Sequence, residues 1–367
     1  MSTAAWVATR KGLFELRRVT HSQPWRIARV SFLGDPVSMV LPGNDHGSFD
    51  GRMFAALNLG HFGVKLHASD DDGKTWHELA TPAYPPQPES EVGAVAQGPA
   101  WKLTQIWAME RSANSLWIGT LPGGLFRSED GGEHWQLVES LWQRPERLEW
   151  MGGGYDAPGI HSICPHPLHP GELLLGISCG GAWRSSDDAQ TWHLRAQGMR
   201  AEFMPPDRQG EQNVQDPHCI ARCEAAPDVL WCQHHNGIFR SIDNGASWQE
   251  LSAQPSSFGF AVAAHPLDAQ TAWFVPAVKD EKRIPTGAAL CVTRTRDGGQ
   301  SFEALRKGLP QQDCYDLIYR HGLTVDETGR HLLMGSTTGN LWASDDGGES
   351  WQSVPAHLPP VYALRFG

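Results

Sequence analysis

Short runs of apolar or alternating residues recur along the whole chain, and the turns between them are rich in glycine, aspartate or proline. Examples are HSICPHP followed by ELLLGIS, and GAWRSSDD followed by WHLR. Alternation of apolar and polar residues over a few positions, bounded by such turns, is typical of strands joined as hairpins. The pattern therefore predicts a chain built from short antiparallel strands.

One turn sequence appears six times between such runs and follows the pattern S-x-D-x-G-x-[ST]-W, with one or two lapses in some copies. The copies end at Trp76, Trp135, Trp192, Trp248, Phe302 and Trp351, and their aspartates follow one another at intervals of 49 to 59 residues. Serine and aspartate side chains can hydrogen-bond the backbone of a tight turn, glycine accepts positive φ, and tryptophan buries a large ring. We predict a structural role, because a catalytic loop is not copied six times at near-constant spacing.

The first copy, SDDDGKTW, also resembles the first half of a calcium-binding loop because it contains three successive aspartates. A complete loop of that kind needs a glutamate at its twelfth position, and none follows here. This disfavours calcium binding and supports the structural interpretation.

Each interval between copies contains two hairpins, so one repeat holds four short strands. Units of this size at regular spacing indicate a β-propeller, whose blades are small antiparallel sheets around a central channel. The first unit has only three strands, and residues 361–366 have nothing to pair with in the last unit. We therefore predict an all-β, seven-bladed β-propeller with four antiparallel strands per blade, in which this C-terminal strand pairs with residues 4–10 and closes the ring.

Composition refines this prediction. The repeats run without a linker, which predicts a single domain over residues 1–367. A net charge of −11 argues against nucleic acid or an anionic membrane as partner. No signal peptide or membrane-spanning run is visible, and seven cysteines, an odd number, favour reduced thiols in a cytoplasm. Oligomeric state is left open.

The six turns resemble the Asp-box, or BNR, repeat shared by bacterial sialidases, related glycosidases, sortilin-type receptors and a photosystem assembly factor. The stretches GHFGVKLHASDDDGKTW and GGLFRSEDGGEHW are also similar to bacterial proteins labelled putative glycosyl hydrolases. The resemblance covers essentially the whole chain and implies a propeller fold. It does not choose a function, because the relatives include enzymes and binding proteins alike.

Sialidase chemistry would require an arginine in an F-R-I-P-type motif ahead of the first repeat. The sequence R-I-P occurs here only at Arg283, inside the sixth blade, so no sialidase residue is transferred. Arg127, Arg184 and Arg240 each precede a repeated turn, and a position that recurs in this way favours a structural role. Another glycosidase that uses two carboxylates stays open.

Histidines gather on the loops that the strand order places opposite the repeated turns. His61 and the pair His234 and His235 lie in turns between second and third strands, while His161 and His218 begin first strands. Converging imidazoles bind divalent metals such as zinc or act as acid and base, whereas each could also satisfy a neighbouring backbone group. We predict His61, His161, His218 and His235 as metal ligands.

The same face should carry long crossovers at residues 80–102, 138–160 and 195–217, and long insertions often mark a functional face. The third-blade crossover, RPERLEWMGGGYDAPG, supplies the catalytic candidates Glu149, Tyr155 and Asp156. The predicted binding residues are Arg147, Asp216 and His234.

Two functions remain open at this stage. One is a glycosyl hydrolase-like enzyme, a hydrolase or lyase with metal assistance, acting on a small polar or carbohydrate-like ligand. The other is a propeller that binds a ligand or a protein without catalysis.

Overall fold

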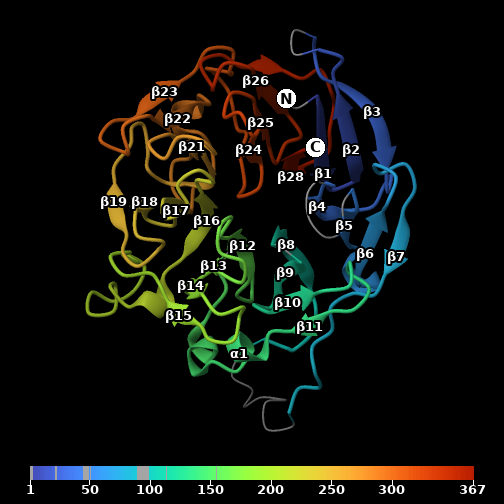
Figure 1. Cartoon of the computed structure of the whole chain (residues 1–367). Coiled ribbons are helices and arrows are strands. Elements are labelled where there is room, and N and C mark those ends of the chain that lie inside the picture. Colours follow the sequence, from blue (N-terminus) through green and yellow to red (C-terminus); the bar gives the residue numbers. More distant parts are fainter. Residues whose placement is uncertain are drawn as a thin grey trace. The chain divides into compact units, whose positions relative to one another are not determined.

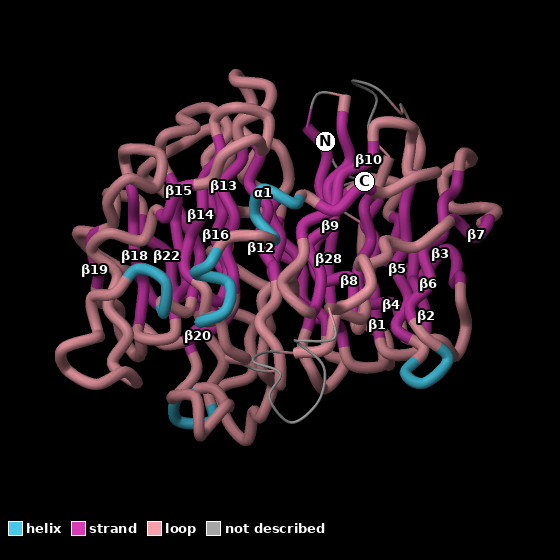
Figure 2. The backbone as a smooth tube through the Cα atoms, turned by 90° about the horizontal axis from the view of Figure 1, so that it is seen from below, coloured by secondary structure: helices cyan, strands magenta, loops and turns pink. Residues whose placement is uncertain are grey.

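The computed structural model describes residues 3–20, 23–43, 49, 51–88, 99–112, 114–153 and 155–367. Within these ranges strands dominate, and the helical segments are all short (Figure 2). The strands form seven sheets of four strands each. The predicted seven-bladed β-propeller is thereby confirmed. The crossover expected at residues 80–102 lies partly outside the described residues.

The C-terminal strand belongs to the first sheet, as predicted (Figure 1). Blade one has the order β28-β1-β2-β3. Strand β28 runs antiparallel to β1 and aligns Ala5 with Phe366, Val7 with Leu364 and Thr9 with Val361. These strands are β1 (Ala4–Thr9), β2 (Gly12–Arg17), β3 (Arg26–Ser31) and β28 (Val361–Phe366).

Two compact units can be distinguished, one formed by Met1–Pro42 with His218–Gly367 and the other by Gly43–Pro217. The first unit holds blade one, blade five, blade six and blade seven. Blade five comprises β16 (Pro217–Arg222), β17 (Leu230–His234), β18 (Gly237–Ser241) and β19 (Gln249–Leu251). Blade six comprises β20 (Gly259–Ala264), β21 (Ala272–Pro276), β22 (Val292–Thr295) and β23 (Glu303–Leu305). Blade seven comprises β24 (Leu323–Val325), β25 (Leu332–Gly335), β26 (Leu341–Ser344) and β27 (Gln352–Ser353).

The second unit holds blade three, blade four and most of blade two. Blade two comprises β4 (Val37–Leu41), β5 (Met53–Asn58), β6 (Val64–Ser69) and β7 (His77–Leu79). Blade three comprises β8 (Gln105–Ser112), β9 (Ser115–Leu121), β10 (Leu125–Ser128) and β11 (Gln136–Leu137). Blade four comprises β12 (Ile160–Pro165), β13 (Leu173–Ile177), β14 (Gly181–Ser185) and β15 (His193–Leu194). The short helical segments are η1 (Gly60–Phe62), α1 (Glu139–Trp142), η3 (Pro145–Glu149), η4 (Gln212–Val214) and η5 (Thr286–Ala288).

The repeated turn is held by its own side chains, as the sequence predicted. In blade five the Ser241 hydroxyl donates to Asp243 Oδ1 at 2.8 Å and accepts the backbone N–H of Gly245. Asp243 in turn accepts the backbone N–H and the hydroxyl of Ser247, at 2.9 and 2.6 Å. These bonds leave the carboxylate fully engaged in the turn, which explains why the motif needs serine, aspartate and a second hydroxyl at this spacing.

These bonds also predict acid sensitivity. Hydrogen bonds from the hydroxyl and backbone N–H of Ser301 lower the pKa of Asp297 from 3.8 to about 2. A carboxylate whose folded pKa is depressed stabilises the fold above its unfolded pKa, and that contribution is lost as pH falls through the folded pKa. We expect the melting temperature to drop between about pH 4 and pH 2. Asp297→Asn should be less stable than wild type at pH 6, and thermal unfolding at several pH values should show this difference shrinking towards pH 2. A difference independent of pH would contradict this role.

Two of the three arginines ahead of the repeated turns bridge to the following blade. Arg127 pairs with Asp188 at 2.8 Å, and Arg240 donates to the carbonyl of Gly298 at 3.2 Å. Arg184 instead pairs with Glu172 of its own blade, at 3.0 Å. The predicted structural role of these three arginines is confirmed.

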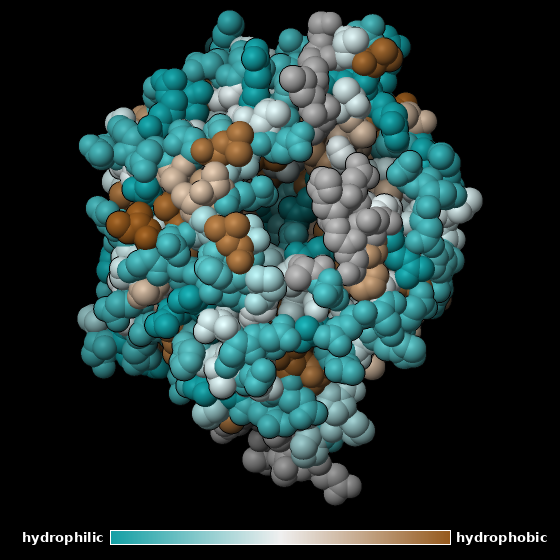
Figure 3. Space-filling model, in the orientation of Figure 1, coloured by the Kyte–Doolittle hydropathy of each residue, from teal (hydrophilic) through white to brown (hydrophobic). Residues whose placement is uncertain are grey.

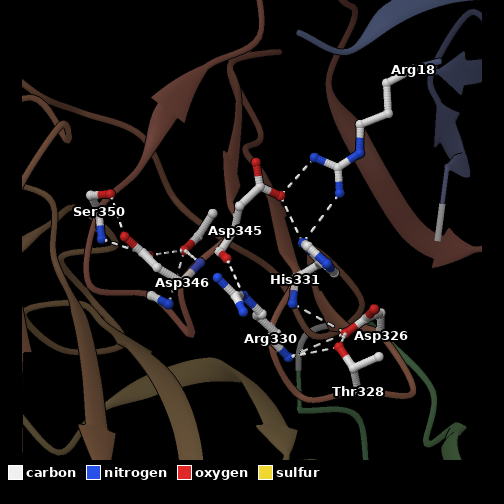
Figure 4. A network of polar contacts seen from close by, with 10 residues as sticks. Arg18, Asp326, Thr328, Arg330, His331, Asp345, Asp346 and Ser350 are labelled. Carbon is white, nitrogen blue, oxygen red and sulfur yellow. Dashed lines mark hydrogen bonds and ion pairs between the residues drawn. The ribbon is translucent and has the colours of Figure 1, made fainter. Parts of the chain in front are cut away.

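Arg18, just after β2, makes a different bridge, from blade one to blade seven. Its side chain is 1% exposed and approaches Asp345 Oδ1 at 2.6 Å and His331 Nδ1 at 3.2 Å (Figure 4). His331 Nδ1 also lies 2.7 Å from Asp345 Oδ1, and the backbone N–H of His331 donates to Asp326. This polar network adds a second connection between the two ends of the chain, beside the pairing of β28 with β1.

Candidate functional site

Among the described residues, three side chains form the one group of histidine, cysteine or acidic residues with metal-binding spacing. They are Asp216, His218 and His235, and one ligand atom from each lies within 4.8 Å of the others. We call them the His218 cluster. Asp216 and His218 flank the first residue of β16, and His235 lies in the turn after β17. Because β17 runs antiparallel to β16, the turn after β17 lies at the end of the blade where β16 begins. His235 therefore lies close to Asp216 and His218.

His218 is held in one orientation by its neighbours. Its Nδ1 lies 2.7 Å from the carbonyl oxygen of Gly259, so Nδ1 carries the proton and donates it. Its ring stacks on Phe260 with centroids 4.5 Å apart and planes 10° from parallel. This leaves Nε2 as the basic nitrogen, and a backbone carbonyl on the other ring nitrogen is the usual support of a metal-binding histidine.

Asp216 is also oriented before any ligand arrives. Its side chain is buried, and Oδ1 accepts the backbone N–H of Cys179 at 3.1 Å and the Ser178 hydroxyl at 3.4 Å. Oδ2 faces Gly153, where a Cβ atom would lie 3.0 Å from it. The glycine-rich part of the 138–160 crossover therefore comes close to this carboxylate because residue 153 has no side chain.

His235 completes the His218 cluster and is half-buried. Its ring meets that of His218 edge to face at a centroid distance of 5.4 Å, and it also contacts Phe258 at 6.0 Å. Two imidazoles and one carboxylate are a donor set that suits zinc and other divalent transition metals, and three protein ligands leave coordination positions for water or substrate.

The structure brings together only part of the predicted metal set. His218 and His235 join, and Asp216, predicted as a binding residue, is the third member. His61 is exposed in η1 with its ring 3.9 Å from that of Phe62. His161 is buried at the start of β12, with Nδ1 2.9 Å from Ser162 Oγ and its ring against Trp107. Neither belongs to the His218 cluster.

His234, predicted as a binding residue, is enclosed within blade five. The side chain is fully buried, its Nδ1 accepts the backbone N–H of Asn236 at 3.1 Å, and its ring contacts Phe239. The adjacent His235 lies just after β17, in the turn, and its ring meets that of His218.

The catalytic candidates of the third crossover lie at the surface, and each described contact of theirs is with a different residue. Glu149 is exposed and accepts a hydrogen bond from Asn213 at 3.2 Å. Tyr155 is 48% exposed and packs against Trp107, while Asp156 is exposed. Arg147 donates to the carbonyl of Trp142 at 2.6 Å and lies over its ring. These contacts hold Arg147 against Trp142. The catalytic role of Glu149, Tyr155 and Asp156 stays a prediction.

Aromatic and basic residues around Phe260 were not anticipated. Phe260 contacts Phe258, Tyr319, Arg283 and Arg320 in addition to His218. The signals in the sequence were the pair of aromatics in SSFGFAV and the insertion VKDEKRIPTG of blade six. Neither pattern indicates that its residues meet the histidines of blade five.

No protein-family model matches the chain. A probable oligoxyloglucan-reducing end-specific xyloglucanase of Neosartorya fischeri is 24% identical over 115 residues, which span 29% of this chain and 12% of that enzyme. The chain thus covers a small part of its curated relative.

Solved structures share the fold at low sequence identity. The GH74 enzyme of Niastella koreensis superposes with a TM-score of 0.57 at 14% identity, over 96% of this chain and 54% of that one. YCF48 from Cyanidioschyzon merolae gives 0.55 at 15% identity, over 89% and 88%. A structure titled YCF48 bound to D1 peptide gives 0.55 at 14%, over 88% and 81%. These likenesses extend to the propeller fold.

The described helices include none with the length and apolar character needed to cross a membrane. The face drawn in Figure 3 is mainly hydrophilic, and its hydrophobic residues form several separate patches.

Proposed function

We propose that this protein is a metal-dependent hydrolase of the glycosidase-like propeller type, with its centre at the His218 cluster. The observation that carries the proposal is the approach of Asp216, His218 and His235 to within 4.8 Å, with His218 already oriented by the carbonyl of Gly259. The similarity to a xyloglucanase and to GH74 enzymes supports a sugar-like substrate. We further assign the six repeated turns to the Asp-box repeat, on their recurrence and their hydrogen bonding.

The chemistry follows from the donor set. A divalent ion held by two neutral imidazoles and a carboxylate would polarise a bound water or a substrate oxygen at neutral pH. Asp216 contributes a charge that is fixed by backbone and hydroxyl donors, so little reorganisation is needed when the ion binds. Phe258 and Phe260 shield one side of the histidines from water and strengthen the electrostatic interactions there.

Metal analysis tests the centre directly. Wild-type protein incubated with zinc and dialysed is expected to retain one ion per chain by mass spectrometry, and saturating zinc should raise its melting temperature. His235→Ala should lower zinc affinity by about 100-fold or more, since it removes a ligand and not merely an outer contact. His61→Ala is the matched control, because it removes an exposed loop histidine outside the cluster and should leave zinc binding unchanged. Equal zinc content in wild type and His235→Ala would reject the site.

Catalysis is tested separately with chromogenic p-nitrophenyl glycosides. The zinc-loaded protein is expected to hydrolyse at least one of them, and chelation should abolish the reaction. Zinc binding without hydrolysis would favour the second candidate, a propeller that binds a peptide or protein. That candidate is supported by the YCF48 structures, one of which is titled as bound to a peptide and which match this chain over most of their own length.

A further inference from the structure

The insertion of blade six lies beside the His218 cluster and has no part in the proposed metal centre. It follows β21 and folds back on itself through a hydrogen bond from the backbone N–H of Val278 to the carbonyl of Ile284, at 2.9 Å. Its Arg283 guanidinium lies over the ring of Phe260, 5.2 Å from the centroid, and His218 stacks on the same ring. This contact places the insertion next to the cluster.

Arg283 is held in place by hydrogen bonds that use only some of its N–H groups. Its Nε donates to the carbonyl of Asp280 at 3.0 Å, one Nη2 hydrogen to Asp280 Oδ1 at 2.5 Å, and one Nη1 hydrogen to the Tyr319 hydroxyl at 3.5 Å. A guanidinium has five N–H groups. The part of the chain that the structure describes therefore offers no partner to one N–H on each terminal nitrogen.

Tyr319 and Phe260 connect this arginine to the metal centre. Tyr319 is half-buried, and its hydroxyl accepts from Arg283, so its own O–H has no acceptor among the described residues. Both side chains contact the ring of Phe260, at 5.1 and 5.2 Å, and His218 stacks on that same ring. Two N–H donors and one O–H donor are thus grouped around the residue that supports the central metal ligand.

We propose that Arg283 and Tyr319 bind an oxyanion, a phosphate or carboxylate group, on the ligand that occupies the His218 cluster. The terminal N–H groups of Arg283 match two oxygens of such a group, and the Tyr319 hydroxyl supplies a further donor. This assignment names the chemical class of ligand for the proposed metal centre and takes its location from that proposal.

The charges around the pair agree with an anionic ligand. Arg320 places a second guanidinium over the Phe260 ring, 5.6 Å from its centroid. The insertion of blade six also contains Lys282 and Lys279, the latter paired with Glu281 at 3.2 Å. Asp280 offsets part of the charge of Arg283, and it also holds the guanidinium so that little side-chain freedom is lost on binding. A bound divalent ion would add to the attraction for an anion.

Calorimetric titration with inorganic phosphate and with acetate tests the assignment, using zinc-loaded and metal-free full-length protein. Phosphate should bind zinc-loaded wild type more tightly than acetate, because it has more oxygens to share between the ion and the guanidinium. Arg283→Gln is expected to weaken both ligands about tenfold or more, and Tyr319→Phe about threefold. Arg283→Lys should fall between wild type and Arg283→Gln, because it keeps the charge and loses the planar pair of donors.

The control is Arg296→Gln, which removes another arginine of blade six that pairs with Glu303 beside a repeated turn. It should leave phosphate affinity unchanged. Equal phosphate affinity in wild type and Arg283→Gln, with zinc bound to both, would overturn this inference and leave the metal centre intact. If wild type binds no zinc, the proposed function fails, whereas phosphate binding that still depends on Arg283 in the metal-free protein would support the oxyanion site.

Discussion

Deletion of residues 361–367 is expected to prevent formation of a stable monomeric propeller. The deletion removes β28, which pairs along β1 and buries Val361, Ala363 and Leu364. Burial of a valine or leucine side chain contributes about 1.5–3 kcal/mol each, and the total stability of a domain is only about 5–15 kcal/mol. Removal of β28 also exposes β1 as an open sheet edge, and such an edge promotes association with other chains.

Size-exclusion chromatography and urea unfolding would measure this effect. The truncated chain should be aggregated or should unfold without cooperativity. A chain lacking only Gly367 loses one backbone hydrogen bond to Ala4 and should stay close to wild type, since β28 ends at Phe366. A truncated protein that remains monomeric, with the unfolding midpoint of wild type, would show that β28 is dispensable for closing the sheet.

Replacement of the tryptophan of the last repeated turn is expected to cause a large loss of stability. Trp351 is 3% exposed and packs in a cluster with Trp273 and Trp342. Truncation of a buried aromatic side chain to alanine typically costs about 3–5 kcal/mol, because transfer energy is lost and a cavity remains. Trp351→Ala should therefore lower the free energy of unfolding by about this amount in urea titrations.

Trp76 provides a matched comparison because it occupies the same position in the first repeated turn but is only half-buried. Trp76→Ala should cost clearly less than Trp351→Ala, since less apolar surface returns to water. Equal losses at the two positions would mean that the turn conformation, and not burial of the ring, determines the role of this tryptophan.

The histidines show why the candidate site was only partly predictable. His61, His161, His218 and His235 all occupy loop or strand-start positions, and sequence spacing could not separate them. In the structure His161 is buried beside Ser162 and Trp107, whereas His218 meets His235. The difference arises from the direction of each side chain, which depends on its neighbours in the folded blade.

The sequence by itself determined the fold, including the seven blades, the repeated turn and the closing role of residues 361–366. These features follow from interactions within a few residues, such as those of Ser241, Asp243 and Ser247, and from a pattern repeated often enough to be recognised. Only the tertiary structure decided the candidate site, because its side chains come from several separate segments of the chain. They are Asp216, His218, His235, Phe260, Arg283 and Tyr319. Each of these contacts occurs once, so no repetition marks it in the sequence, and it exists only when packing of the blades sets the position and rotamer of each side chain.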